Sequence, residues 1–165
     1  MSVVSKKYHP MQRHLTRLAA VQALYQQEIT HESIKHIISQ YRQHDLVHWS
    51  DLLNNVKLDW PFFDLLVAGV ADNQEKIDQL LRNNLEKEWP IDRLETVLRV
   101  ILRAATFEFS NFSDIPIKVI ITEYVNITGC FYESKEIGFI NKILDLISSQ
   151  IRPTSPHDQP EKTSL

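Results

Sequence analysis

The chain has 165 residues, of which 43% are hydrophobic and 24% are charged, and its formal net charge is −3. This composition is typical of one globular domain, excludes a disordered chain, and argues against a protein that holds nucleic acid by overall charge alone. The single cysteine, Cys130, excludes an intramolecular disulfide, and no apolar run approaches a membrane span, so we expect a cytoplasmic protein without a membrane segment.

The charges are unevenly distributed along the chain. The first 27 residues carry four basic side chains and no acidic one, whereas residues 28–95 carry thirteen acidic against seven basic side chains. Any contact with a polyanion is therefore expected to begin near the N-terminus.

The first helix is predicted to follow a flexible arm of residues 1–10, because Pro10 suits a first helical turn and the pattern continues to about Glu28. Its expected inward face consists of Met11, Leu15, Leu18, Gln22, Tyr25 and Ile29. Arg13 and Arg17 lie one turn apart on a different arc, with His14 between the two faces. This basic strip is either a phosphate-binding surface or a merely solvated face.

Two further helices are predicted before residue 86. The apolar spacing of residues 31–44 indicates a short amphipathic helix, and residues 45–59 are expected to be irregular. Pro61 is expected to open one longer helix that reaches about Leu85. Gly69 lies inside it, which predicts close packing against a neighbouring helix.

The central helix is predicted over Trp89–Phe109. Its apolar stripe has helical spacing and consists of Leu94, Val97, Leu98, Ile101, Leu102, Ala105 and Phe109. Asp92 and Glu95 resemble a capping box, and Glu95, Arg99 and Arg103 have the i, i+4 spacing of helix ion pairs. One side is thus expected to face the core and the other to face water or a partner.

The C-terminal part is predicted to contain a helix that ends near Gly129, a last helix over residues 135–151 and a disordered tail over residues 153–165. Phe139 falls outside the apolar arc of the last helix, beside Lys135 and Lys142. The whole pattern predicts an all-α protein with one helical domain over residues 11–152.

Enzymatic signatures are mostly absent from the sequence. Three scattered glycines cannot form a phosphate-binding loop, and Glu86 and Glu88 are typical of a solvated surface. His44 and His48 have spacing that suits metal ligands, but without a third ligand the signal is weak. We expect no catalysis, no cofactor and no metal; a metal-dependent enzyme that uses the two histidines remains a rival hypothesis.

The residues favour a binding function instead. Arg13, His14 and Arg17 are candidates for phosphate contacts, and Phe139 beside Lys135 is a candidate for stacking on an unpaired base. The alternative for Phe139 is a place in the secondary core, which is the commoner position for such a residue.

Three blocks of the sequence resemble the NusB family of transcription antitermination factors. They are RLAAVQALYQQE from Arg17, WPIDRLETVLRVILRAATFEFSNFSDIPIKVIITEYVNI from Trp89, and GFINKILDLISSQIRP from Gly138. The resemblance implies one compact helical domain of two packed helical subdomains and a role that is not enzymatic. It also implies joint binding, with ribosomal protein NusE, of a boxA-like single-stranded RNA, which helps RNA polymerase resist termination during ribosomal RNA synthesis.

The resemblance also implies site residues. By position, the RNA-facing residues are expected to be Arg13, His14, Arg17, Tyr25, Phe131, Lys135 and Phe139, with Asn141 as a structural support. The NusE surface is expected on the later helices, with Arg99, Arg103 and Glu108 as its candidates. Some relatives hide the RNA surface in a homodimer, so a homodimer is a further expected partner state.

This chain departs from the family pattern at several of these positions. Leu15 and Thr16 interrupt the usual run of arginines, Leu98 replaces a common acid, Tyr132 a glycine and Gly138 a lysine. We expect weaker RNA binding by the protein alone and a shallower salt dependence. The thinner arginine run also supports the alternative of an all-helical protein-interaction adapter with little RNA affinity.

Overall fold

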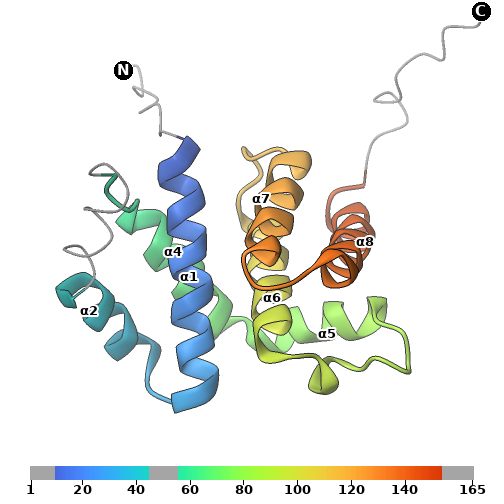
Figure 1. Cartoon of the computed structure of the whole chain (residues 1–165), viewed down its shortest axis with the longest axis horizontal. Helices are drawn as coiled ribbons and strands as arrows, with labels where there is room; N and C mark the ends of the chain where they lie inside the picture. The colour runs from blue at the N-terminus through green and yellow to red at the C-terminus, as the bar shows by residue number, and fades with distance from the viewer. Residues whose placement is uncertain (1–9, 45–55, 154–165) are drawn as a thin grey trace, which may run out of the picture.

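Helices form all the regular structure in the computed structural model, which describes residues 10–44 and 56–153. Within these ranges there are seven α-helices, one 3₁₀ turn and no strand, so the predicted all-α class is confirmed. With the labels of Figure 1, they are α1 (Pro10–Thr30), α2 (Ile34–His44), α4 (Trp60–Asp72), α5 (Gln74–Asn84), η1 (Ile91–Arg93), α6 (Thr96–Asn111), α7 (Ile117–Gly129) and α8 (Ser134–Ile151).

The helices form two packed groups, as expected. Helices α1, α2 and α4 contact one another on one side of the molecule, and α5, α7 and α8 gather around α6 on the other (Figure 1). Helix α6 also contacts α1 and α4, so it joins the two groups. The core is therefore continuous through α6.

Helix α1 buries a face of short side chains. Its closely packed residues include Ala19, Ala20 and Ala23, which allow α4 and α6 to approach its backbone. The predicted inward arc is wrong at three of its positions, because these side chains are exposed: Met11, Tyr25 and Ile29. The buried face of α1 is therefore determined by its small alanines rather than by the large apolar side chains that define the predicted arc.

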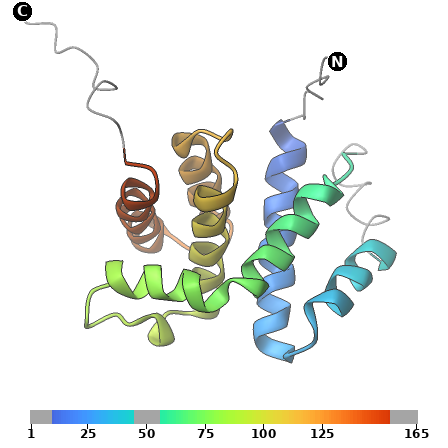
Figure 2. The same ribbon diagram turned by 180° about the vertical axis from the view of Figure 1, so that it is seen from behind.

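The predicted single helix over residues 61–85 is wrong, because α4 and α5 are separate helices that meet at a bend (Figure 2). At the bend, Asn73 ends α4: its backbone N–H and its side-chain amide both donate to the carbonyl of Gly69, at 3.1 and 2.8 Å. The close packing predicted at Gly69 is confirmed. A Cβ atom there would lie 2.0 Å from Cζ of Phe107 on α6.

The central helix starts later than predicted, at Thr96. Before it, Ile91–Arg93 forms the 3₁₀ turn, and the extended backbone of Leu94 separates the two. The predicted capping box is wrong, since the Glu95 side chain makes no capping bond and instead accepts a 2.8 Å hydrogen bond from the Tyr132 hydroxyl. The expected solvent-facing side is also wrong, because α6 is buried on nearly all sides from Val100 to Phe109.

Arg152 closes the C-terminal end of the bundle. Its guanidinium donates to four backbone carbonyls around the α6–α7 turn, at 2.6–3.2 Å: those of Glu108, Phe109, Phe112 and Ile115. The carbonyls of Glu108 and Phe112 also accept from the backbone N–H groups of Phe112 and Ile115, so Arg152 adds a second donor to these two. It also supplies a donor to the carbonyls of Phe109 and Ile115, because carbonyls near a helix end lack helical partners.

Some predictions lie outside the described residues. These are the arm before Pro10, the irregular segment over residues 45–55, the tail after Pro153, and the metal-binding pair, whose member His48 is not described. Among the described residues, no cluster of metal-ligating side chains occurs and no helix has the length and apolarity to cross a membrane.

Candidate nucleic-acid interface

The basic residues at the start of α1 are each paired with an acidic residue of another segment. The Nε of Arg13 donates to Asp59 at 2.8 Å, and its guanidinium lies 4.2 Å from the ring centroid of Phe62. His14 Nδ1 lies 2.8 Å from a carboxylate oxygen of Glu123. The basic strip predicted from the sequence is therefore largely neutralised within the fold.

Arg17 lies inside the bundle rather than on the strip. Only 3% of its surface is exposed, and it donates two hydrogen bonds to Glu108, at 2.8 and 2.9 Å. Glu108 is fully buried and also accepts a 2.5 Å bond from the hydroxyl of Tyr124. Burial by itself would lower the pKa of Arg17, but the hydrogen bonds and charge of Glu108 raise it above the ordinary value. Burial and the same carboxylate raise the pKa of Tyr124, so its hydroxyl stays protonated.

A second ion-pair network lies further along α6. Arg103 donates to Asp78 on α5 and to Glu28 on α1, at 2.7–2.9 Å, and Arg99 donates to Glu28 at 2.8 Å. Burial opposes ionisation of Glu28, but its bonds to Arg99 and Arg103 dominate and lower its pKa. Burial also opposes ionisation of Arg103, but Asp78 and Glu28 dominate and raise its pKa.

The candidate NusE residues are thus internal. Arg103 and Glu108 are buried and Arg99 is half-buried, which differs from the surface position that the prediction requires. The i, i+4 spacing of Arg99 and Arg103 is real, but their partners are Glu28 and Asp78 rather than Glu95. Periodicity could not identify these partners because they come from other helices.

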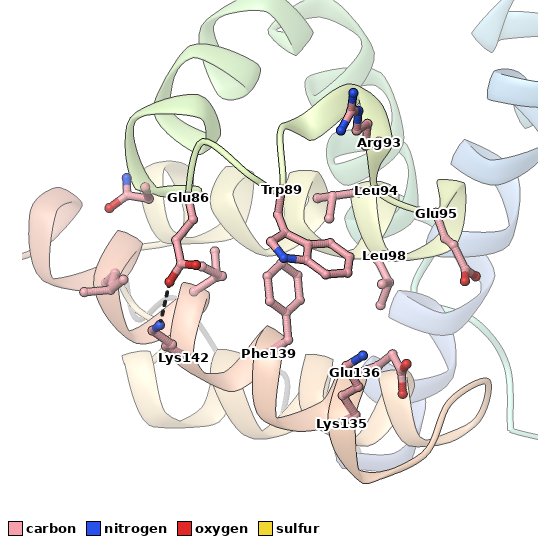
Figure 3. Close-up of a pocket in the computed structure, with 13 residues that line it drawn as sticks. Glu86, Trp89, Arg93, Leu94, Glu95, Leu98, Lys135, Glu136, Phe139 and Lys142 are labelled. Carbon is pink, nitrogen blue, oxygen red and sulfur yellow. Dashed lines mark hydrogen bonds and ion pairs between the residues drawn. The ribbon is translucent and has the colours of Figure 1, made fainter.

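The aromatic and basic residues near the α7–α8 junction remain accessible. Phe131 is 45% exposed and Lys135 is exposed. Phe139 is half-buried, since it packs against the core and also lines a cavity (Figure 3). Tyr25 on α1 is exposed.

Trp89 is the residue of this site that the sequence argument missed. The sequence pattern predicts a place at the start of the central helix, yet Trp89 lies in the connection between α5 and η1 and is 52% exposed. Its ring lies on the cavity, and Nζ of Lys135 is 5.8 Å from the ring centroid (Figure 3). The available signal was a large aromatic residue within the charged connection EKEWP.

Glu86, Trp89 and Phe139 belong to a cavity of about 630 Å³ between the α5–α6 connection and α8. Its wall also includes Leu94 and Leu98, so apolar surface lies beside the charged rim. A site of this kind suits a ligand with a flat, partly apolar part and a charged part. A nucleotide has this combination.

Comparisons with known proteins agree with the fold. The model of the NusB family matches residues 14–149. The chain is 42% identical over 141 residues to the transcription antitermination protein NusB of Agrobacterium fabrum, covering 86% of each protein. It is also 42% identical to NusB of Allorhizobium ampelinum, covering 86% of this chain and 88% of that protein.

Solved structures give the same result. NusB of T. maritima superposes with a TM-score of 0.70 at 30% identity, covering 86% of this chain and 93% of that one. A structure of antitermination factors NusB and NusE in complex with dsRNA has a TM-score of 0.69 at 20% identity, covering 85% and 98%, which supports the fold. The chain belongs to the NusB family of transcription antitermination proteins.

Proposed function

We propose that this protein binds a boxA-like single-stranded RNA together with ribosomal protein NusE and thereby supports antitermination during ribosomal RNA synthesis. The observation that carries the proposal is the group formed by the exposed Phe131 and Lys135 and the half-buried Phe139 near the α7–α8 junction. Exposed aromatic rings stack on unpaired bases, and a neighbouring cation attracts the backbone. A solved protein of the same fold has been described as antitermination factors NusB and NusE in complex with dsRNA, which supports NusE and RNA as joint partners.

The residues of α1 have a smaller role in the proposal. Arg13 and His14 reach the surface at its N-terminal half, but their carboxylate partners must be displaced or shared before they contact a phosphate. Tyr25 adds an exposed ring on the same helix. Arg17 is assigned a supporting role, because its buried guanidinium holds α1 against α6. The stacking residues therefore contribute more to affinity than the basic strip does.

The mechanism proposed is assembly without bond chemistry, so it needs no cofactor and no metal. RNA and NusE would be held side by side on the helical surface and delivered to RNA polymerase in the cytoplasm. Arg103 and Glu108 would act indirectly, by holding α6 against the helices whose outer faces meet a partner. A homodimer that covers the RNA-facing residues is the remaining partner prediction.

A protein-interaction adapter with little RNA affinity is the second candidate. The pairing of Arg13 and Arg17 with acidic residues favours it, because a phosphate gains little from a cation that is already neutralised. The imidazole of His14 is likewise occupied by Glu123. The two candidates differ in whether RNA sequence affects binding.

Fluorescence anisotropy separates them. Labelled boxA-like RNA and a scrambled control are titrated with the protein, with and without NusE, across a salt series. We expect specific binding that tightens when NusE is added. Lys135→Gln should weaken it and reduce the salt slope by about 0.7, whereas Lys76→Gln, an exposed lysine on α5, should not. Equal, weak binding of both RNAs in every condition would refute the proposal and favour the adapter.

A further inference from the structure

The cavity beside α8 has two aromatic residues from segments that are far apart in the sequence. Trp89 comes from the α5–η1 connection and Phe139 from α8, and Leu98 and Ile143 also line the cavity. Figure 3 shows the indole of Trp89 and the ring of Phe139 both directed into this space. A half-exposed tryptophan on an apolar cavity is a common feature of binding surfaces, where its burial is completed by a ligand.

The charges around the cavity are balanced. Three acidic residues (Glu86, Glu95 and Glu136) and three basic residues (Arg93, Lys135 and Lys142) line it. Glu86 and Lys142 pair at 3.3 Å, and Glu95 accepts from Tyr132. A phosphate inside the cavity would gain no net attraction from this ring of charges. A neutral, planar group suits it better, with a phosphate at the edge near Lys135.

We propose that this cavity receives one unpaired nucleobase of the bound RNA, with Trp89 and Phe139 as its aromatic contacts and Lys135 beside the adjoining phosphate. This inference depends on the proposed function, and it adds Trp89 as a residue that determines where the RNA lies. The cavity volume of about 630 Å³ is within the roughly 300–1,000 Å³ range of small-molecule sites, so a base with its ribose has room to enter.

Lys135 links the cavity to the rest of the RNA surface. Its ammonium lies over the Trp89 ring at 5.8 Å, within the distance of a cation–π contact. The same residue belongs to the group near the α7–α8 junction that contains Phe131. A base that stacks on the indole replaces the ammonium there, and the ammonium turns to the phosphate. Lys135 thus belongs both to the cavity wall and to the start of α8, close in sequence to the exposed Phe131.

The test combines a protein variant with modified RNAs. A series of boxA-like RNAs, each with one abasic nucleotide, is titrated by anisotropy against the wild type and Trp89→Leu in the presence of NusE. In the wild type we expect one abasic position to weaken binding about fivefold to a hundredfold, the range of one stacking interaction. That position should have little further effect in Trp89→Leu, and Trp89→Phe should restore most of the difference.

The controls separate this inference from the proposed function. Leu65→Ala removes an equally exposed apolar side chain on α4 and should leave all the RNA affinities unchanged. Stacking is not ionic, so Trp89→Leu should keep the salt slope of the wild type. If RNA binds specifically but no abasic position depends on Trp89, the base pocket is refuted and the proposed function stands. If Trp89→Leu weakens NusE binding instead, the cavity is a protein-docking site. If the wild type does not distinguish boxA-like from scrambled RNA, both proposals fail.

Discussion

Replacing Arg17 by methionine separates a structural role from an RNA contact. The substitution keeps a long side chain but leaves the fully buried carboxylate of Glu108 without its cation. The hydroxyl of Tyr124 remains as a donor, but it does not compensate the charge. Removing one partner of a buried ion pair costs about 3–5 kcal/mol of unfolding free energy. For a domain of this size the melting temperature should fall by roughly 6–20 °C.

The assay is urea and thermal unfolding followed by circular dichroism at 222 nm. The double variant Arg17→Met with Glu108→Gln removes both charges and keeps an acceptor for Tyr124. It should therefore lose about 2 kcal/mol less than the sum of the two single variants. A loss below about 1 kcal/mol for Arg17→Met, or single effects that simply add, would refute the buried-pair argument.

RNA affinity gives an independent readout of the same variant. Below its melting transition, Arg17→Met should bind RNA within about twofold of the wild type, since its guanidinium is buried. A tenfold loss with the fold intact would instead place Arg17 on the RNA.

Three further substitutions test the packing and the charges. Gly69→Ala should lower the free energy of unfolding by about 1–3 kcal/mol, because the new methyl group overlaps the ring of Phe107. The double variant with Phe107→Leu should recover part of this loss in the same unfolding assay. Glu28→Gln should destabilise the protein at neutral pH and have little effect on stability in acid. Because the pKa of Glu28 is lowered by folding, its carboxylate stabilises the fold above about pH 4.5, and this stabilisation is lost as the pH falls through the folded-state pKa. Equal losses of unfolding free energy at pH 7 and pH 3 would contradict this prediction. Arg152→Ala should lower the free energy of unfolding by at least about 2 kcal/mol, since four carbonyls lose a charged donor. Arg152→Lys should recover only part of this loss. Unchanged urea midpoints would argue against a stabilising role for this set of Arg152 hydrogen bonds, the Arg152 clamp.

The sequence predicts the peripheral helices well. Residues 31–44 and 135–151 have apolar positions at regular helical spacing, and each forms a helix within a few residues of its predicted bounds. The helix predicted to end near Gly129 ends there. Gly69 also led to a correct prediction, because a glycine inside a helix indicates close packing against a neighbouring helix. Local patterns were sufficient where one face of a helix meets the core and the other meets solvent.

Prediction failed where tertiary contacts override the local pattern. The sequence pattern predicts surface positions for Arg17 and Glu108, because nothing local indicates that each neutralises the other inside the bundle. The bend at Asn73 depends on a side-chain cap that competes with helix continuation. At the candidate site, the spacing of residues within one helix was enough to identify Lys135 and Phe139. It could not identify Trp89, because this residue comes from a segment about 50 residues earlier in the chain.

The clamp formed by Arg152 has a consequence for synthesis on the ribosome. The Arg152 side chain that donates to the carbonyl of Phe109 lies 43 residues later in the chain, so it is synthesised after that carbonyl. At about 5–20 residues per second, that interval lasts roughly 2–9 seconds. During this interval the end of α6 and the whole of α7 are synthesised before their Arg152 donor exists. The C-terminal half of the bundle therefore cannot complete its hydrogen bonding until Arg152 has been added, and a chain that stops before Arg152 would leave these carbonyls without this donor.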